Sequence, residues 1–376
     1  MHTRMCDEFG IEFPIFAFSH CRDVVAAVSR AGGMGVLGAL AFSPAQLEIE
    51  LAWIDEHTDG KPYGVDIVMP ASSETAAGDI SEEQLQAMIP QRHRDFVEGV
   101  LARNNVPPLP EDAPKLAGLL GWVPGTARSH VDVSLTHRPS LLVNALGPPP
   151  PDVVQKAHGH GMKVAALVGR ADQALKQQEA GVDIIVAQGH EAGGHTGEIA
   201  TMVLVPEVVR AVHPTPVLAA GGIGSGRQMA AALALGADGV WTGSIWLTVK
   251  EADTGEVVTE KLLRAGSRDT VRSRSMTGKP APQLRTPWTE AWEAPDSPGT
   301  LPMPLQFMLT ADAQARMRRS ADAGGPGKDL VTMPVGQIVG SMNAVRPARD
   351  VIYGMVQEYI DTVSAMSSAL AASVTE

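Results

Sequence analysis

One stretch of the sequence combines residue types suited to acid–base chemistry with a backbone that can approach a ligand closely. An apolar run, residues 182–187, is followed by Gln188 and by a glycine-rich turn that carries Glu191 and His195. The run is typical of a strand buried on both faces of a parallel sheet. Glycine has no Cβ to hold a ligand away from the backbone. We therefore interpret this stretch as a strand that ends at the edge of an active site.

His195 is the residue of this turn best suited to move a proton, because an unperturbed imidazole has a pKa of about 6.5. The alternative is a hydrogen-bonded structural histidine, but the glycine turn after a buried strand favours a functional one. His190 lies nearby, yet the sequence places no third ligand beside the pair. We therefore expect no metal site here.

Two further glycine-rich turns follow apolar runs and suit a phosphate group. Gly221 and Gly222 follow the run 216–220, and Gly243 and Ser244 lie in the run 239–245. Backbone N–H groups beside a helix N-terminus bind a dianion without a lysine. The pattern predicts a phosphorylated cofactor or substrate; the alternative is that these glycines serve tight turns only.

The elements that would position these residues alternate regularly between strands and helices. Strands are predicted at 14–18, 34–39, 63–69, 141–146, 163–168, 182–187, 216–220 and 239–245. Helices separate most of them, and strand–helix alternation implies parallel pairing with right-handed crossovers. Eight such units within about 250 residues predict an α/β fold, a (β/α)8 barrel, whose active site lies at the carboxyl ends of its strands. An open doubly wound sheet is the alternative, but no Gly-x-Gly-x-x-Gly motif follows the first strand.

Two segments interrupt the alternation. Residues 71–130 form an insertion after the third strand, with a helix predicted over 82–104, and residues 251–335 form a lid or subdomain. The last segment, within 336–376, predicts an amphipathic helix from 347 to about 370 that packs back as the eighth helix of the barrel. The barrel itself, insertion included, is expected within residues 1–250.

Composition limits the function classes and the compartment. The chain of 376 residues has a net charge of −12 and no basic run, so we expect no nucleic-acid partner. Cys6 and Cys21 cannot form a disulfide framework, which favours a reducing cytoplasm. The first residues lack the apolar core of a signal peptide, and no run approaches the roughly 18 apolar residues of a membrane helix. A soluble cytoplasmic protein without membrane contact is expected.

Two polar residues each have two interpretations. Asp66, near the end of the third predicted strand, can contact a ligand or cap a turn. Lys279, in the predicted lid, can reach a phosphate or be an ordinary surface lysine.

The turn of residues 188–197 has the pattern Gln-Gly-x-Glu-Ala-Gly-Gly-His-x-Gly, which resembles the hallmark of the nitronate monooxygenase family, formerly the 2-nitropropane dioxygenases. Members are FMN-dependent (β/α)8 barrels. The similarity extends to residues 63–66, 219–223, 239–244 and 277–281 and so covers most of the predicted barrel.

The resemblance implies FMN as cofactor, with its phosphate on Gly222 and on the turn of residues 241–244. The implied cofactor-binding residues are Ala17, Phe18, Asp66, Gln188, Gly193, Gly194, Gly221, Gly222, Trp241, Thr242, Gly243 and Ser244. His195 matches the catalytic histidine that takes a proton from the carbon beside a nitro group. The reduced flavin then reacts with O2, and a carbonyl compound and nitrite are the products. The flavin carries the redox chemistry while the protein orients and deprotonates.

These observations leave three hypotheses for the function. The leading one is a monooxygenase of nitronates or related carbon acids that uses O2, with a homodimer as a possible assembly. An NAD(P)H-dependent FMN reductase of enoyl or acyl thioesters is the alternative, and a non-catalytic flavin-binding barrel is the third. The sequence departs from the family at Asp66, where asparagine is usual, at Thr196, where arginine is common, and in the first strand, which continues as residues 17–20.

Overall fold

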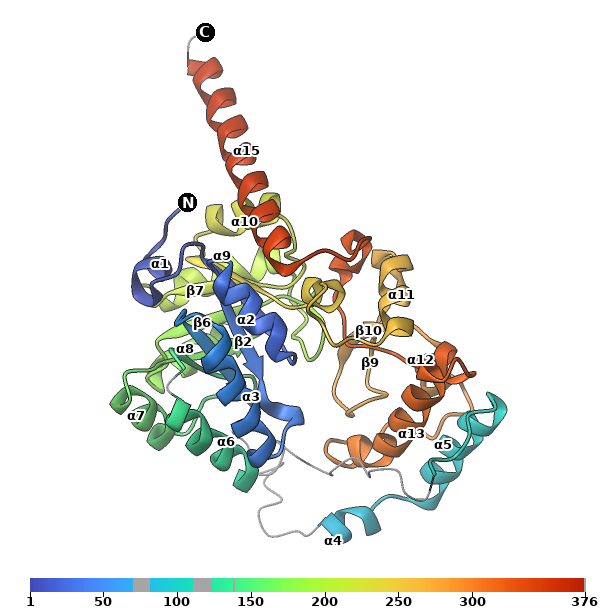
Figure 1. Cartoon of the computed structure of the whole chain (residues 1–376). Helices are drawn as coiled ribbons and strands as arrows, with labels where there is room; N and C mark the ends of the chain where they lie inside the picture. Colours follow the sequence, from blue (N-terminus) through green and yellow to red (C-terminus); the bar gives the residue numbers. More distant parts are fainter. Residues whose placement is uncertain (70–81, 111–123, 138, 375–376) are drawn as a thin grey trace.

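A closed barrel of eight parallel strands is the centre of the fold (Figure 1). The computed structural model describes residues 1–69, 82–110, 124–137 and 139–374. The strands are β1 (Ile15–Ser19), β2 (Met34–Gly38), β3 (Tyr63–Ile67), β4 (Leu141–Asn144), β5 (Lys163–Val168), β6 (Ile184–Gln188), β7 (Val217–Ala220) and β8 (Gly239–Thr242). Pairing of β1 with β8, with Ala17 opposite Thr242, closes the barrel. The predicted (β/α)8 barrel is confirmed, and the open sheet is excluded.

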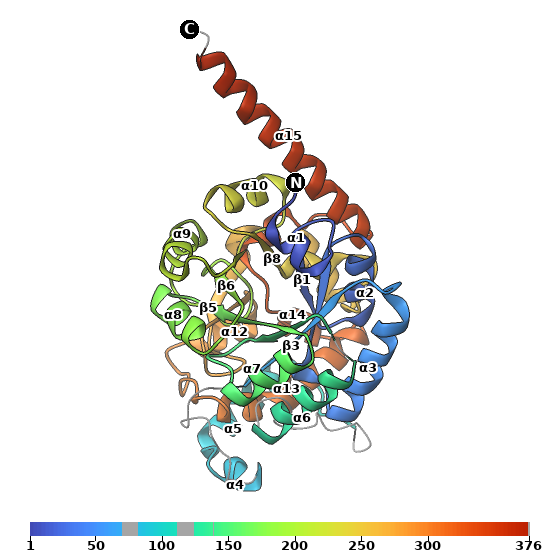
Figure 2. The same ribbon diagram turned by 90° about the vertical axis from the view of Figure 1, so that its left-hand side faces the viewer.

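Helices surround the barrel on its outer face (Figure 2). They are α2 (Arg22–Arg30), α3 (Pro44–His57), α6 (Pro124–His137), α7 (Pro151–Gly159), α8 (Ala171–Glu179), α9 (Thr201–Val212) and α10 (Gly226–Ala234). The start of α3 follows the sequence signal, because the Ser43 hydroxyl accepts from the Gln46 N–H and Pro44 takes the first helical position. The sequence did not predict α6. The helix α9 contains Pro206 within its span.

The interior of the barrel is closed at its amino-terminal end. A short helix that the sequence did not predict, α1 (Arg4–Phe9), packs Met5, Cys6 and Phe9 against inward-facing residues of the strands. The ring of Phe9 meets that of Phe16 edge-to-face at 5.7 Å. Lys163 at the foot of β5 forms an ion pair with Glu8 of α1 at 2.9 Å. A ligand therefore reaches the barrel interior from the carboxyl ends of the strands.

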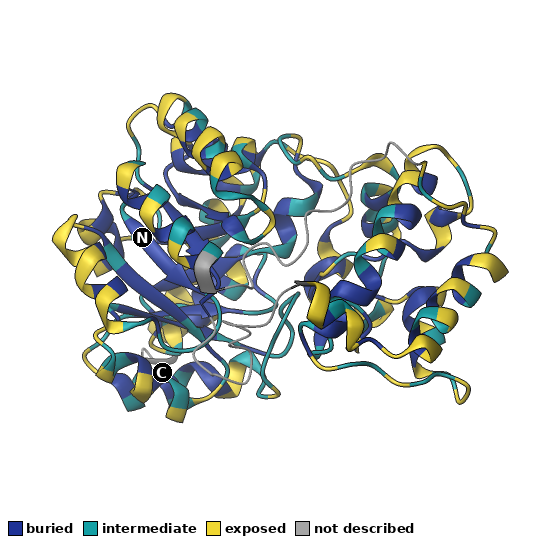
Figure 3. Cartoon of the chain, turned by 90° about the horizontal axis from the view of Figure 1, so that it is seen from below, coloured by how far each residue is buried: buried dark blue, intermediate teal, exposed yellow. Residues whose placement is uncertain are grey.

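A second hydrophobic core lies beside the barrel mouth (Figure 3). It joins the insertion helices α4 (Glu82–Ala87) and α5 (Gln91–Arg103) to α12 (Pro287–Glu293), α13 (Leu305–Asp322) and α14 (Gly327–Leu330) of the 251–335 segment. Arg316 of α13 donates two hydrogen bonds to the carboxylate of Glu98 on α5, at 2.8 and 2.9 Å. The predicted single helix over 82–104 is wrong, because α4 ends before Pro90 and Pro90 precedes the first turn of α5. Between the barrel and this core lie α11 (Glu256–Arg264) and a hairpin of β9 (Thr270–Ser273) and β10 (Ala281–Leu284).

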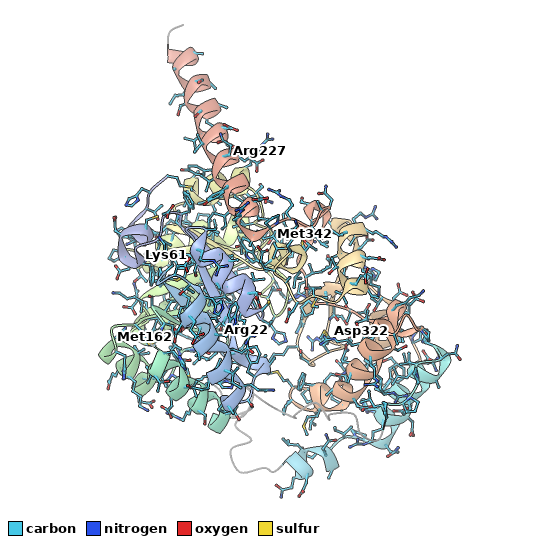
Figure 4. All side chains as sticks on the ribbon, viewed as in Figure 1. Arg22, Lys61, Met162, Arg227, Asp322 and Met342 are labelled. Atoms are coloured by element: carbon cyan, nitrogen blue, oxygen red, sulfur yellow. The ribbon has the colours of Figure 1, made fainter. Side chains whose placement is uncertain are left out.

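The last helix, α15 (Ala348–Val374), has two unlike halves. Its first turns bury Ile352 and Met355 and pack against α10 and α2. Arg227 of α10, which is labelled in Figure 4, forms an ion pair with Glu358 at 3.2 Å. Its second half projects from the barrel and exposes apolar side chains such as Met366 and Leu370 (Figure 1). Within the described parts of the chain, no helix is both long and apolar enough to cross a membrane.

Candidate active site

Four of the residues predicted to bind a cofactor point into the barrel at its open end. Phe18, Asp66, Gln188 and Trp241 occupy inward-facing positions, because neighbouring residues of each strand pack outward. The rings of Phe18 and Trp241 stack at 6.3 Å with an interplanar angle of 29°. The side-chain amide of Gln188 makes no hydrogen bond to any residue that the structure describes. An aromatic surface and a free amide therefore face the same space.

Asp66 contributes a buried carboxyl group to this space. The residue is 5% exposed, and its Oδ1 atom has no hydrogen-bond partner within the described part of the chain. Burial raises the pKa of this carboxyl well above its usual value, because a charge would lie in an apolar interior. Burial thus favours the neutral form of this carboxyl, in which it can donate a hydrogen bond to a ligand.

The turns after β7 and β8 form a cradle of backbone N–H groups. Gly221 and Gly222 have φ angles of 102° and 68°, which favour glycine. The N–H groups of Gly222, Ile223 and Ser244 have no acceptor among the residues described. A Cβ built on Gly243 would meet no heavy atom within 4 Å. Open space lined by unpaired N–H groups fits the phosphate of a cofactor.

Three other predicted cofactor residues have side chains that are committed to the protein. Ala17 is fully buried between the barrel and the surrounding helices. The hydroxyl of Thr242 donates to Phe16 O at 3.0 Å and accepts from the Trp246 indole N–H at 3.0 Å. The hydroxyl of Ser244 accepts from the Gly336 N–H at 2.9 Å. Contact of Ala17 and Thr242 with a ligand would therefore run through their backbone atoms, whereas the Ser244 hydroxyl can still donate its own proton.

Gly193 and Gly194 bring the turn after β6 against the 251–335 segment and the chain that follows it. A Cβ on Gly193 would lie 2.8 Å from the Cα of Val335 and 2.9 Å from the N of Gly336. Gly194 has a φ of 75°, and its N–H donates to Pro282 O at 3.2 Å. Close packing of backbone on backbone explains the glycine at 193, and the positive φ angle explains the glycine at 194, where an added Cβ would meet no atom within 4 Å.

Glu191, which the sequence suggested as an active-site side chain, supports α9. Its carboxylate accepts from the Thr201 N–H at 3.0 Å and from the Thr201 hydroxyl at 2.9 Å. Thr201 is the first residue of α9, where a negative charge is favourable. The carboxylate is therefore a helix cap.

His195 lies where the barrel meets the tip of the β9–β10 hairpin. Its Nε2 atom is 2.8 Å from the hydroxyl oxygen of Thr277 in that tip. The same hydroxyl accepts a hydrogen bond from the backbone N–H of Lys279 at 3.3 Å. Burial, followed by the positive charge of Lys279, lowers the pKa of His195 to about 4. The imidazole is therefore neutral near pH 7 and able to accept a proton.

The similarity to the family covers Thr277 within residues 277–281, but no local pattern predicts its contact with His195, which lies 82 positions away in the sequence. The antiparallel pairing of Ser273 with Ala281 turns the chain back between them and so positions the hairpin tip. Gly278, with a φ of 83°, allows the tight turn within the tip.

Fold and site together define a class of protein, a (β/α)8 barrel whose mouth has a neutral histidine and a cradle of N–H groups suited to a phosphate. Comparison with known sequences gives the family. The sequence profile of nitronate monooxygenases matches residues 2–358, and the chain belongs to this family. It is accordingly a flavin-dependent oxidoreductase of the monooxygenase type.

Relatives and solved structures agree with this assignment. The chain is 57% identical over 366 residues to a Mycobacterium tuberculosis protein, Rv1533, which is named only as a monooxygenase. This alignment covers 96% of the chain and 98% of Rv1533. A Staphylococcus aureus (strain Newman) protein named as a nitronate monooxygenase is 28% identical over 351 residues, with 89% and 91% covered.

Among solved structures, FabK from Thermotoga maritima is 28% identical to this chain, with a TM-score of 0.73. The alignment covers 98% of this chain and 99% of the FabK chain. A nitroalkane oxidase from Streptomyces ansochromogenes shares the fold, with a TM-score of 0.79 at 24% identity. The alignment covers 96% of this chain and 99% of the oxidase chain.

Proposed function

We propose that this protein is an FMN-dependent nitronate monooxygenase that converts alkyl nitronates or nitroalkanes and O2 into a carbonyl compound and nitrite. The observation that carries the proposal is the neutral imidazole of His195 at the barrel mouth, held 2.8 Å from the Thr277 hydroxyl. Membership of the family supports the same activity.

The residues at the mouth fit FMN. The unpaired N–H groups after β7 and β8 would bind its phosphate, and the free amide of Gln188 and the neutral carboxyl of Asp66 would donate to its ring system. Bound there, the flavin supplies the redox chemistry.

His195 would act as the base toward a neutral nitroalkane. Above pH 5 its ring is uncharged and can take the proton from the carbon that bears the nitro group, while Thr277 fixes the plane of the ring. A nitronate is already deprotonated at that carbon, so it would bypass this step.

Anaerobic mixing tests the proposal. The purified protein should be yellow, and propyl-2-nitronate should bleach the flavin in the absence of NAD(P)H. The variant His195→Asn should keep its flavin but lose about 10²- to 10⁴-fold in turnover of neutral 2-nitropropane. Unchanged turnover in this variant would remove the histidine from its role as base.

A second candidate is an NAD(P)H-dependent reductase of enoyl or acyl thioesters, which the similarity to the enoyl reductase FabK favours. Bleaching by NAD(P)H alone, with no response to the nitronate, would support this function instead. Bleaching by neither compound would contradict both candidates.

A further inference from the structure

The β9–β10 hairpin beside His195 carries three cations in different environments. Arg272 donates to the Thr196 carbonyl at 2.9 Å and to the Glu198 carboxylate at 3.3 Å, so its charge is engaged. Arg274 is exposed to solvent. Lys279 is partly buried, and its ammonium group has neither an ion-pair nor a hydrogen-bond partner in the described residues.

The backbone of the tip places Lys279 beside Thr277 and His195. Its backbone N–H donates to the Thr277 hydroxyl, which also contacts the imidazole of His195. Gly278 between them turns tightly, and a Cβ there would lie 2.2 Å from the Leu301 carbonyl oxygen, so the neighbouring chain fixes the turn. The ammonium is near enough to the imidazole for its charge to act on it.

Partial burial of an ammonium without a partner is unfavourable, because the group loses water and gains no acceptor. A ligand anion would supply the missing partner. The protein as a whole carries a net charge of −12, so an anionic substrate needs a local positive group at the point where it binds.

We propose that Lys279 forms the anion-binding subsite of this active site, in which it receives the negatively charged nitro-group oxygens of a nitronate beside Thr277 and His195. The choice of a nitronate as the ligand rests on the function proposed above. The binding of an anion by Lys279 does not depend on that function. The subsite makes the enzyme select the anionic nitronate over the neutral nitroalkane.

Nitrate, a planar monovalent anion with the same O–N–O group, is a suitable probe. Its Kd is measured by isothermal titration calorimetry on the flavin-loaded protein, for the wild type, Lys279→Met, Lys279→Arg and Lys328→Met. Lys328 is an exposed lysine of α14, so its variant is a charge-matched control. Loss of Lys279 should weaken nitrate binding about tenfold or more, as expected for a charged hydrogen bond. The arginine variant and the control should stay close to the wild type.

Kinetics give the second readout. In Lys279→Met the KM for propyl-2-nitronate should rise, while the KM for 2-nitropropane changes little. Equal nitrate affinity in wild type and Lys279→Met, or no nitrate binding by the wild type, would overturn the subsite. Nitrate binding through Lys279 without any turnover of a nitronate would support the subsite and contradict the proposed function. Flavin content and Tm report whether each variant folds, and Lys279→Gln replaces the methionine variant if that one does not.

Discussion

The Nε2 atom of His195 and the hydroxyl oxygen of Thr277 lie 2.8 Å apart, although 82 positions separate the two residues in the sequence. One residue follows a barrel strand and the other lies at the tip of the β9–β10 hairpin. Under the proposed function, the active site is complete only when the hairpin packs against the turn after β6. Backbone contacts of Gly193 and Gly194 with the same region hold the two parts together.

Replacement of Thr277 tests whether this contact orients the base. Thr277→Val keeps the shape of the side chain but removes the hydroxyl, so turnover of neutral 2-nitropropane should fall about 10- to 100-fold. Turnover of propyl-2-nitronate should change much less, because this substrate needs no base. Thr277→Ser should restore the turnover of 2-nitropropane. Nitrite release measures both rates. An equal fall for both substrates would indicate a general disturbance of the site.

The pH dependence of turnover should reflect the low pKa of His195. Because the imidazole loses its proton at about pH 4, turnover of 2-nitropropane should be constant from about pH 6 down to pH 5 and fall below that, near pH 4. Removal of the Lys279 charge takes away a repulsion that disfavours the protonated imidazole, so in Lys279→Met the fall should move to higher pH. A fall centred near pH 6.5 in the wild type would contradict this environment for His195.

Two glycine-to-alanine variants separate cofactor binding from stability. Gly243→Ala adds a methyl group to open space at a φ of −131°, so Tm should stay unchanged while FMN affinity falls about tenfold. Gly193→Ala forces a methyl group against the backbone of Val335 and should cost about 1–3 kcal/mol of stability. Thermal unfolding and titration of the apoprotein with FMN give the two quantities. Unchanged FMN affinity in Gly243→Ala would place the phosphate elsewhere.

Asp66→Asn should stabilise the protein at neutral and alkaline pH. The raised pKa of Asp66 means that the native state holds a proton that the unfolded chain has released, so the wild type loses stability as the pH rises above about 4. The amide does not titrate, and it keeps a hydrogen-bond donor at this position. The Tm of the variant should therefore exceed that of the wild type at pH 8, and the gap should shrink toward pH 4. A gap independent of pH would show that the carboxyl is not the cause.

The barrel and its interior could be predicted from the sequence because they depend on local patterns. Continuous apolar runs such as 184–187 mark strands that are buried on both faces, and the glycines at 221 and 222 mark the turn after β7. The inward orientation of Gln188 follows from the alternation of side chains along the same strand.

Long-range packing explains what the sequence did not reveal. Glu191 caps a helix that begins ten residues later, and Thr277 reaches His195 only through a hairpin whose strands are four residues each. The α1 helix is short, and it closes the amino-terminal end of the barrel by packing against residues from several strands. Neither the shared core of α5 and α13 nor the ion pair of Glu98 with Arg316 has a local signature.

Oxygen consumption with propyl-2-nitronate is the most direct test of the central claim. We predict that the flavin-loaded enzyme consumes O2 and releases nitrite and acetone from this substrate without added NAD(P)H. A yellow, folded enzyme that consumes no O2 and releases no nitrite with the nitronate, but oxidises NAD(P)H in the presence of an enoyl thioester, would contradict it.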